Sequence, residues 1–562
     1  MKFFTEEKRR TLLAAAIPAV IIAVLLSTAG IYFETNDDRC ITEILAGILS
    51  PGPDAHAVYI NYLLALPLSL AYRAALWLPW YGGMLILFQL VLYFCMLDSA
   101  FSCCTGRMET AVTGVAGTAF IVSNLYLSGK IQFTSTAAML AAAGYVCLLL
   151  DRREKRGLRR FAVLELLAFL LRGQSMLMIQ PVGLAVFGGW ILCQRDQKLS
   201  EKCIKILRVL AVFAAVLLIG TMGHMAGYHT PEWREYEEYN RARTELFDYY
   251  GVPSYEECRM ILDRYGVTQA QYQAFGQYDN LYGEINAACA RELADYARQN
   301  AGRGPDFKTV LTGLIQNVLH GEFRGSNTMM LAAWLLFGTV ILLKRNWRML
   351  LPAAGLAVSE ALVWGYLLFR GRMPLRVTLP LFFCATALLL ALSLRQERGG
   401  ETAAGRMILL AVCGVLVGKG FTAGISQYRY VKQNNEIQKI YMSGMSQIQD
   451  YCEKYPDRKY VIEAGALTYY QGSALETEIY RKRDSMAAGC WYSNSPSMRN
   501  RLKEYLGEGL AGYDVIVYED GSSGSHVILE YLREKFDAEP VKQDQFSVAN
   551  GAVYAVYSFD AE

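Results

Sequence analysis

Long apolar stretches separated by short polar connections fill most of the first 425 residues. The first of them, 11–33, runs 23 residues without a charged side chain. About 20 helical residues cross the hydrocarbon core of a bilayer, and no small-residue cleavage pattern follows this stretch, so it is predicted to be a retained membrane span. Ten further stretches have the same character: 82–102, 110–127, 131–150, 161–171, 176–193, 207–226, 328–343, 349–369, 375–394 and 406–425.

Lysine and arginine are concentrated in alternate connections between these stretches. They gather before residue 11, at 107, in the run 151–160, and at 195–205, 344–348 and 395–406. Because the cytoplasmic loops of membrane proteins carry an excess of Lys and Arg, these connections are predicted to lie in the cytoplasm. With the N-terminus inside, eleven crossings place the C-terminus outside the cell.

Two segments need a separate interpretation. The segment 58–76 is apolar enough to cross, but a crossing there would put the basic run 151–160 outside. We therefore expect an interfacial or re-entrant helix on the outer face, where amphipathic rings such as those of 77–81 settle; an ordinary span with an atypical loop is the alternative. In 161–193, Arg172 interrupts an apolar stretch with two basic flanks, which predicts two short spans meeting outside at Arg172.

This topology predicts a mainly α, polytopic membrane protein with four parts. They are an N-terminal transmembrane module, 1–226, with a first outer loop, 34–81, that carries interfacial helices; an extracytoplasmic helical insertion, 227–327; C-terminal transmembrane helices, 328–425; and an extracytoplasmic α/β domain, 426–562.

Local patterns predict the elements of the two large outer parts. In the insertion, 232–249 is a polar and aromatic helix, Ser254 and Thr268 begin capping boxes, and 307–323 has one apolar face at helical spacing. In the last part, an alternation of helices and strands is typical of a small α/β layer domain. Its expected helices are 430–455, 497–506 and 525–536, and its expected strands are 459–463, 513–518 and 545–559.

Composition narrows the class of protein. An apolar content of 53% with only 19% charged residues argues against an entirely soluble chain, and 12% aromatic residues exclude a disordered one. A net charge of +3 offers no global basic field to neutralise phosphates, so nucleic-acid binding is not expected. The sequence contains no P-loop pattern, and its one G-x-G-x-x-G match, 507–512, precedes an expected strand instead of opening a helix, so nucleotide binding has no support.

The cysteines suggest little chemistry. Thirteen are present without a C-x-x-C pair, and eight fall in predicted spans or inner loops. The outer ones are Cys40, Cys258, Cys289, Cys452 and Cys490. Because their number is odd, a complete disulfide framework is not expected.

An acidic segment, Glu34-Thr-Asn-Asp-Asp-Arg39, follows the first span at once. A carboxylate at the outer end of a membrane helix costs free energy unless it is solvated, paired with a cation or required for function. These carboxylates are therefore candidates for a functional site. Asp37 and Asp38 could act as a general base toward an acceptor hydroxyl, or bind a divalent cation such as Mg²⁺ or Mn²⁺ that neutralises a diphosphate. The alternative is structural: Asn36 or Asp37 caps a helix over 38–49, and the other carboxylates are solvated.

Five cations break the charge pattern on the outer side, where the positive-inside rule predicts few. They are Lys130, Arg172, Arg370, Arg372 and Arg376. Together they predict an anionic partner held near the membrane surface, such as a lipid-linked phosphate or pyrophosphate. Any one of them could instead contact ordinary headgroups or cap a helix C-terminus.

Three polar residues near these groups are candidates for positioning a substrate. Glu34 precedes the acidic pair, and Gln132 lies two residues after Lys130. His56 follows Asp54 in a segment rich in Pro and Gly, for which a plain turn is the alternative.

These features together resemble the GT-C superfamily of integral-membrane glycosyltransferases. The shared features are an N-in first span that ends in an acidic pair, an outer loop with interfacial helices, about eleven spans, and a soluble outer C-terminal domain. More narrowly, several segments look like a group of uncharacterised Gram-positive GT-C-like proteins. They are Glu34-Thr-Asn-Asp-Asp38, 51–61, Trp80-Tyr-Gly82, Gln132-Phe-Thr-Ser-Thr136, 232–250 and Gly371-Arg-Met-Pro-Leu-Arg376.

The resemblance implies roles for the candidate residues. In relatives such as protein O-mannosyltransferases and aminoarabinose transferases, an Asp in the first outer loop is the base or the cation ligand, and outer Arg and Lys residues hold the phosphate of a polyprenyl-phosphate sugar. By motif position, the first role falls on Asp37 or Asp38. The second falls on Arg372, Arg376, Arg172 and Lys130, with Arg370 in the same turn.

The expected function is therefore transfer of a sugar from a polyprenyl-phosphate donor to a cell-envelope acceptor (polysaccharide, teichoic acid, lipid or protein) outside a bacterial plasma membrane. One base with no second carboxylate at a set spacing favours an inverting, single displacement. The only cofactor considered is the divalent cation. Two alternatives stay open: a lipid-linked polysaccharide polymerase, ligase or flippase, and a non-catalytic envelope scaffold whose last domain binds glycans.

Overall fold

The computed structural model describes residues 6–302, 304–321, 325–396, 402–467, 470–477, 485–507, 513–519 and 526–559. Nine helices within these ranges are long and apolar enough to cross a membrane. They are α1 (Glu6–Thr28), α4 (Trp80–Ser102), α7 (Phe133–Leu150), α8 (Glu154–Cys193), α9 (Leu199–Gly227), α15 (Ser326–Lys344), α16 (Leu350–Phe369, after a 3₁₀ turn at Trp347–Met349), α17 (Leu375–Leu394) and α18 (Ala403–Lys454).

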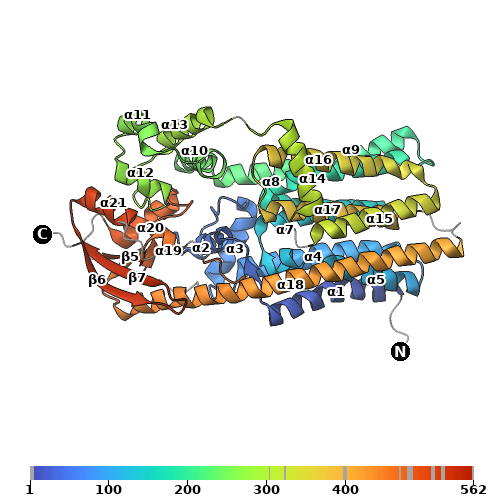
Figure 1. Cartoon of the computed structure of the whole chain (residues 1–562), viewed down its shortest axis with the longest axis horizontal. Coiled ribbons are helices and arrows are strands. Elements are labelled where there is room, and N and C mark those ends of the chain that lie inside the picture. Colours follow the sequence, from blue (N-terminus) through green and yellow to red (C-terminus); the bar gives the residue numbers. More distant parts are fainter. Residues whose placement is uncertain are drawn as a thin grey trace.

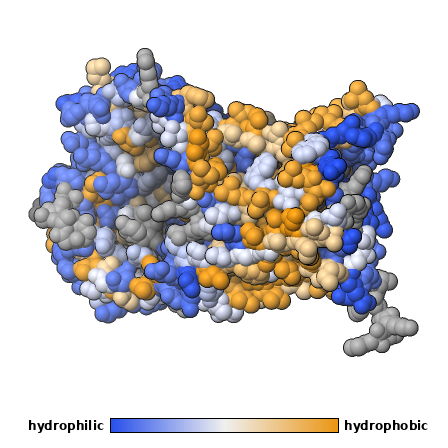
Figure 2. Space-filling view, turned by 45° about the vertical axis from the view of Figure 1, so that its right-hand side comes forward, coloured by the Kyte–Doolittle hydropathy of each residue, from blue (hydrophilic) through white to orange (hydrophobic). Residues whose placement is uncertain are grey.

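The apolar helices form one bundle whose outer surface suits lipid. Its interior holds α7, which is almost wholly buried, whereas α1, α9 and α18 expose large apolar side chains such as Val20, Leu218 and Leu410. Figure 2 shows the resulting apolar band, with hydrophilic surface beyond it at both ends. Because a soluble protein rarely exposes so large an apolar area, the chain is a membrane-embedded protein.

The difference between eleven expected spans and nine helices has two sources. The stretch 110–127 forms α5 (Arg107–Val122), which has 16 residues, and a separate short helix, α6 (Leu125–Gly129). The two expected spans of 161–193 belong to the single 40-residue helix α8.

Helix α8 is broken at the residue where the sequence predicts it. Arg172 has non-helical backbone angles, φ −160° and ψ 93°. Gln180 Nε2 donates to Glu165 Oε2 at 2.9 Å, although 15 residues along a straight helix would separate them by about 22 Å. The two halves of α8 therefore fold back against each other, and their junction lies at Arg172.

Several other boundaries differ from the prediction. The expected first span, 11–33, ends as a helix at Thr28, and the expected helix over 38–49 is α2 (Asn36–Ala46). Thr35 occupies the N-cap position of α2, so neither Asn36 nor Asp37 caps it. Within 58–76 only α3 (Tyr62–Ala74) is helical, and its 13 residues are too few for an ordinary span.

The insertion is helical, as predicted. It contains α10 (Pro231–Glu245), a π-helical turn (Leu246–Tyr250), α11 (Tyr255–Tyr265), α12 (Gln269–Gly276), α13 (Ala287–Asn300) and α14 (Phe307–His320). Ser254 and Thr268 form the predicted capping boxes before α11 and α12. Helix α13 is not among the sequence predictions.

A small mixed sheet lies at the opposite end of the molecule from the N-terminus, below the insertion in Figure 1. Its strands are β3 (Lys459–Ile462), β4 (Ser485–Ala487), β5 (Tyr513–Glu519), β6 (Pro540–Ser547) and β7 (Val553–Phe559), in the order β4-β3-β5-β7-β6. Strand β3 is parallel to β4 and β5, and the other pairs are antiparallel. Helices α19 (Ala464–Leu467), α20 (Pro496–Leu506) and α21 (Val527–Phe536) complete this part, and the expected turn at 521–525 lies outside the described residues.

One helix connects the bundle to the sheet. Helix α18 has 52 residues and continues without a break from the apolar band to the sheet (Figure 1). Because side chains of a strand alternate between faces, Tyr460 and Ile462 of β3 pack with Ile448 of α18, whereas Val461 packs with the core that includes Leu532 of α21. The C-terminal half of α18 thus covers one face of the sheet.

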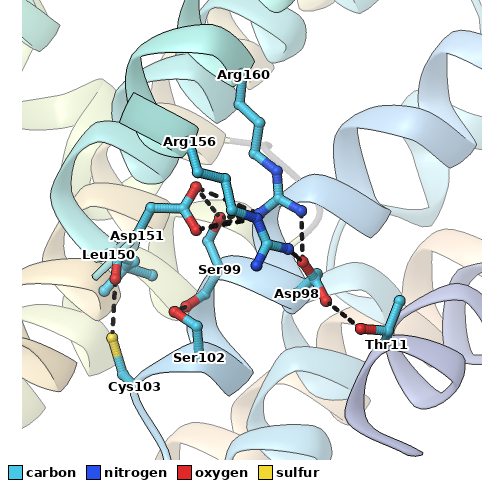
Figure 3. Close-up of polar contacts among 9 residues, drawn as sticks. All are labelled: Thr11, Asp98, Ser99, Ser102, Cys103, Leu150, Asp151, Arg156 and Arg160. Carbon is cyan, nitrogen blue, oxygen red and sulfur yellow. Dashed lines mark hydrogen bonds and ion pairs between the residues drawn. The ribbon is translucent and has the colours of Figure 1, made fainter. Parts of the chain in front are cut away.

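A network of buried ion pairs ties together the helix ends near the N-terminus (Figure 3). Asp98 of α4 pairs with both Arg156 and Arg160 of α8, and Asp151, just after α7, accepts from Arg160 Nη1 at 3.3 Å. Thr11 of α1 donates to Asp98 Oδ1 at 3.0 Å. Side chains of Asp98 and Asp151 are only 5% and 1% exposed, so neither carboxylate has water as an alternative partner.

We expect Asp98→Asn to lower the thermal stability of the protein, by about 3 kcal/mol, because it leaves Arg156 and Arg160 to share one buried carboxylate, Asp151, where they had two. The matched control is Glu154→Gln: the Glu154 side chain is 49% exposed and pairs with Lys205 and Arg208, and exposed pairs contribute about 1 kcal/mol or less. Thermal unfolding in detergent, followed by tryptophan fluorescence, measures both. Equal melting temperatures for the two variants would contradict the prediction.

Candidate functional site

Asp38 lies at the first turn of α2, fully buried, and contacts two other segments. Its Oδ1 accepts a hydrogen bond from Tyr81 of α4 at 2.8 Å and from the backbone N–H of Phe133, the first residue of α7, at 3.1 Å. Its Oδ2 is buried and has no hydrogen-bond partner in the described part of the chain. Burial raises the pKa of Asp38 well above its usual value, against the opposing effect of the Tyr81 bond, so its neutral form is favoured.

Asp37, one residue earlier, occupies a different environment. It is partly exposed and accepts a hydrogen bond from Thr35 Oγ1 at 3.4 Å. It attracts the guanidinium of Arg172 electrostatically. Asp37 is therefore the member of the acidic pair that faces a cation and solvent.

Arg172 lies over aromatic rings at the break in α8. Its guanidinium carbon is 4.9 Å from the ring centre of Tyr59 and 5.4 Å from that of Phe133. Phe133 thus links Asp38 to Arg172, because its backbone N–H bonds Asp38 and its ring contacts Arg172. A cation held over ring faces, as here, keeps its charge available to an anion.

Glu34 and Lys130 are brought together by a short parallel strand pair. Strands β1 (Tyr32–Phe33) and β2 (Lys130–Ile131) pair with Tyr32 opposite Lys130, and Glu34 N donates to Ile131 O at 3.1 Å. Burial raises the pKa of Glu34 to about 7, although Arg376 attracts its charged form. Burial also lowers the pKa of Lys130 to about 8, while Glu34 opposes this shift.

The other two arginines of the 370–376 turn lie farther along the same surface. Arg372 pairs with Asp248 at 3.0 Å, and its guanidinium carbon is 5.0 Å from the ring centre of Tyr249. The guanidinium carbon of Arg370 is 4.5 Å from the centre of the same ring. Arg376 and Tyr249 both interact electrostatically with Arg172, which links this turn to Asp37.

The remaining two candidates have structural contacts. Gln132 caps α7, with its Oε1 accepting from Thr134 N at 2.6 Å, while its Nε2 is buried and finds no partner among the residues that the structure describes. His56 bonds Asp54 through Nδ1 at 2.6 Å and Gly227 O through Nε2 at 3.1 Å. Both ring nitrogens of His56 are thus used, and His56 does not face Asp37.

His56 borders a separate cavity of about 590 Å³ between α10 and α20. Its ring stacks on Trp233 with a centroid distance of 4.2 Å. Trp233, Tyr236 and Tyr239 line the cavity with the exposed cations Arg499 and Lys503. Aromatic faces beside charged and amide groups suit a sugar, which has both apolar ring faces and hydroxyl groups.

The described residues contain no group of three or more His, Cys, Asp or Glu side chains placed to hold a metal ion. At Asp38, one oxygen is already bonded to two donors. The donor set around Asp37 and Asp38 therefore does not fit a divalent cation held by protein side chains alone.

Two residues at the site are not found by sequence reasoning. Arg243 donates to the hydroxyl of Tyr59 at 3.0 Å and to that of Tyr278 at 3.1 Å, which fixes Tyr59 beneath Arg172. Asp248 pairs with Arg372 from the π-helical turn. The only signal in the sequence is the density of tyrosine and charge in 232–249, which predicts a helix and does not indicate which face it presents.

One glycine allows the last part of the chain to reach the site. A Cβ atom on Gly82 would lie 1.7 Å from the carbonyl oxygen of Ala474. Ala474 N in turn donates to Ile31 O at 3.0 Å. The segment around 471–474 therefore packs directly between α4 and the end of α1.

Comparison of the chain with protein-family models and with curated proteins gives no match. The assignment of the site consequently depends on its own geometry and on the residues that resemble the GT-C pattern.

We expect Glu34→Gln to change how stability depends on pH. A folded-state pKa raised from 4.5 to about 7 contributes stability that is present below pH 4.5 and lost as pH rises through 7. The melting temperature of the unmodified protein should therefore fall relative to that of Glu34→Gln between pH 5 and about 7.5. The measurement is thermal unfolding across that range, with exposed Glu238→Gln as the control; parallel curves for Glu34→Gln and the unmodified protein would refute the shift.

Proposed function

We propose that the protein is an integral-membrane glycosyltransferase of the GT-C type. It transfers a sugar from a polyprenyl-phosphate donor to a cell-envelope acceptor on the outer face of a bacterial plasma membrane. The observation that carries the proposal is that Arg172 interacts electrostatically with both Asp37 and Arg376, which come from two other segments far apart in the sequence.

The proposed orientation has the N-terminal end of the bundle in the cytoplasm. Hydrogen bonds between the basic segments that connect the helices support their lying at the same end of the bundle. Arg10 bonds Cys104 O at 2.7 Å, Arg152 bonds Cys103 O at 3.0 Å, and Cys193 bonds Arg348 O at 2.9 Å. With α5 and α6 taken as one crossing and α8 as two, the chain crosses eleven times. The insertion and the sheet then lie outside.

The proposed reaction divides roles between the two aspartates. Asp37 accepts the proton of the acceptor hydroxyl, whose oxygen attacks the anomeric carbon while the bond from that carbon to the phosphate oxygen breaks. Polyprenyl phosphate leaves with the bonding electron pair, and the anomeric configuration inverts. Asp38, buried and neutral, is a positioning residue that fixes the start of α2.

The cations of the site stabilise the leaving phosphate. Arg172 interacts electrostatically with Asp37, and Arg376 and Lys130 interact electrostatically with Glu34. Charge that develops on a phosphate in a water-poor site is stabilised strongly by cations already in place. Arg370 and Arg372, which contact Tyr249, would hold the lipid-linked end of the donor.

The cavity beside His56 supplies a place for the acceptor. Tyr236, which lines it, donates to Trp491 O at 2.9 Å, and the Trp491 ring lies 4.5 Å from that of Tyr59. Because Tyr59 contacts Arg172, a single layer of aromatic residues separates the cavity from the charged site. An extended glycan could rest in the cavity with its reactive end near Asp37.

We expect Asp37→Asn to reduce sugar transfer by at least about 100-fold, the usual effect of removing a general base. Arg172→Gln and Arg376→Gln should weaken binding of polyprenyl phosphate. Transfer of radiolabelled hexose from a polyprenyl-phosphate hexose, and equilibrium binding of polyprenyl phosphate to protein in nanodiscs, are the two measurements. The controls are Glu238→Gln and Arg73→Gln, since Arg73 is exposed and bonds Pro53 O.

Two outcomes would overturn the proposal. Full transfer by Asp37→Asn would eliminate the base assignment. Absence of polyprenyl-phosphate binding, combined with polysaccharide binding lost in Trp233→Ala, would favour the glycan-binding scaffold instead.

A further inference from the structure

Two cysteines far apart in the sequence contact each other beside the candidate site. The Sγ atoms of Cys40 and Cys490 are 3.9 Å apart, although 450 residues separate them. Cys40 is on α2, two residues after Asp38, and Cys490 follows β4 in the C-terminal part. Neither belongs to a C-x-x-C motif, so the sequence gives no sign of the pairing.

We propose that Cys40 and Cys490 form a disulfide bond that fastens the C-terminal domain to the helix carrying Asp37 and Asp38. A disulfide requires an S–S distance of about 2.05 Å. The thiols therefore need to approach by roughly 2 Å, which side-chain rotation and a small backbone adjustment can supply. The proposal depends on the outer orientation given above, since disulfides persist outside the cytoplasm.

The surroundings of the two thiols differ, and the difference determines which thiol reacts first. Cys490 is partly exposed, so it is accessible to an oxidant, and its Sγ accepts a hydrogen bond from Tyr492 N at 3.3 Å. Cys490 N also bonds Ser493 Oγ at 2.8 Å, which fixes the turn. Cys40 is buried, and burial raises the pKa of its thiol. Cys490 is thus the first nucleophile.

The oxidant is a disulfide, either of a thiol oxidoreductase or of a small molecule. The Cys490 thiolate attacks one sulfur of the oxidant, and the other sulfur leaves as a thiolate. Cys40 then loses its proton and attacks the Cys490 sulfur, which releases the second thiolate of the oxidant. The protein gives up two electrons and two protons, and the oxidant becomes two thiols.

The disulfide would add a covalent bond to an interface that is otherwise held by non-covalent contacts. Next to Cys490, the ring of Trp491 lies 4.5 Å from that of Tyr59. Next to Cys40, the guanidinium carbon of Arg39 lies 3.6 Å from the ring centre of Tyr470. A covalent bond between these contacts would prevent the C-terminal domain from lifting away from α2.

The test counts free thiols before and after oxidation. The full-length protein, reduced or treated with oxidised glutathione, is denatured and labelled with a polyethylene-glycol maleimide, and the gel shift gives the number of labelled cysteines. We expect oxidation to remove two labels from the unmodified protein and from the control Cys258→Ser. Cys258 is a suitable control because it is buried in the insertion and its Sγ donates to Ser254 O. Cys40→Ser and Cys490→Ser should lose none.

Mass spectrometry identifies the pair directly. Tryptic digestion of oxidised protein should give a linked species of the peptides containing Cys40 and Cys490, two hydrogens lighter than their sum. Unchanged labelling of all thirteen cysteines, or linkage of a different pair, would overturn the proposal.

A final measurement uses cells in which thiols are blocked before lysis. If the disulfide forms with oxidised glutathione but is absent from the blocked cells, the proposal that the protein carries it in the living cell is wrong. That outcome leaves the result of the Asp37→Asn transfer assay unaffected, so failure of the disulfide and failure of the glycosyltransferase proposal are distinguishable.

Discussion

The buried carboxyl group of Asp38 joins the segment that follows α1 to the membrane bundle, and the arrangement of the site depends on this junction. One oxygen accepts from a side chain of α4 and from the first backbone N–H of α7. That N–H belongs to the first turn of a helix and has no partner within it, so Asp38 satisfies a group that would otherwise be buried and unpaired. The bond fixes α2 and thereby the direction in which Asp37 points.

The burial of Asp38 explains why it differs in protonation and accessibility from Asp37, its neighbour in the sequence. No cation among the described residues pairs with Asp38, and its full burial favours its neutral form. Asp37 is partly exposed and lies in the field of Arg172. A residue that accepts a proton has to be ionised and accessible to the substrate. A residue that only anchors a helix is more stable when it is buried and uncharged. In the proposed reaction, the first turn of α2 therefore presents an accessible carboxylate, Asp37, and its buried support, Asp38.

The sequence predicts the membrane helices and most of the outer helices because these follow from local patterns: apolar length for the spans and capping boxes at Ser254 and Thr268. It also locates the break at Arg172, where a charge interrupts two short apolar halves. It does not predict β1 and β2, which have two residues each and exist only because the ends of α1 and α6 meet. The contacts of Arg243 and Cys490 are missed for the same reason, since their partners are distant in sequence.

The C-terminal part contributes to the charged site as well as covering it. Lys130 Nζ donates to Asn435 of α18 at 3.3 Å and to Gln471 at 3.0 Å, and both acceptors come from the last quarter of the chain. These amides are neutral, so they orient the ammonium group without cancelling its charge. Because α18 runs unbroken from the bundle to the sheet, a shift of the C-terminal domain would move Asn435 and Gln471 relative to β2. The electrostatic field of the site is therefore coupled to the position of a domain outside the helix bundle.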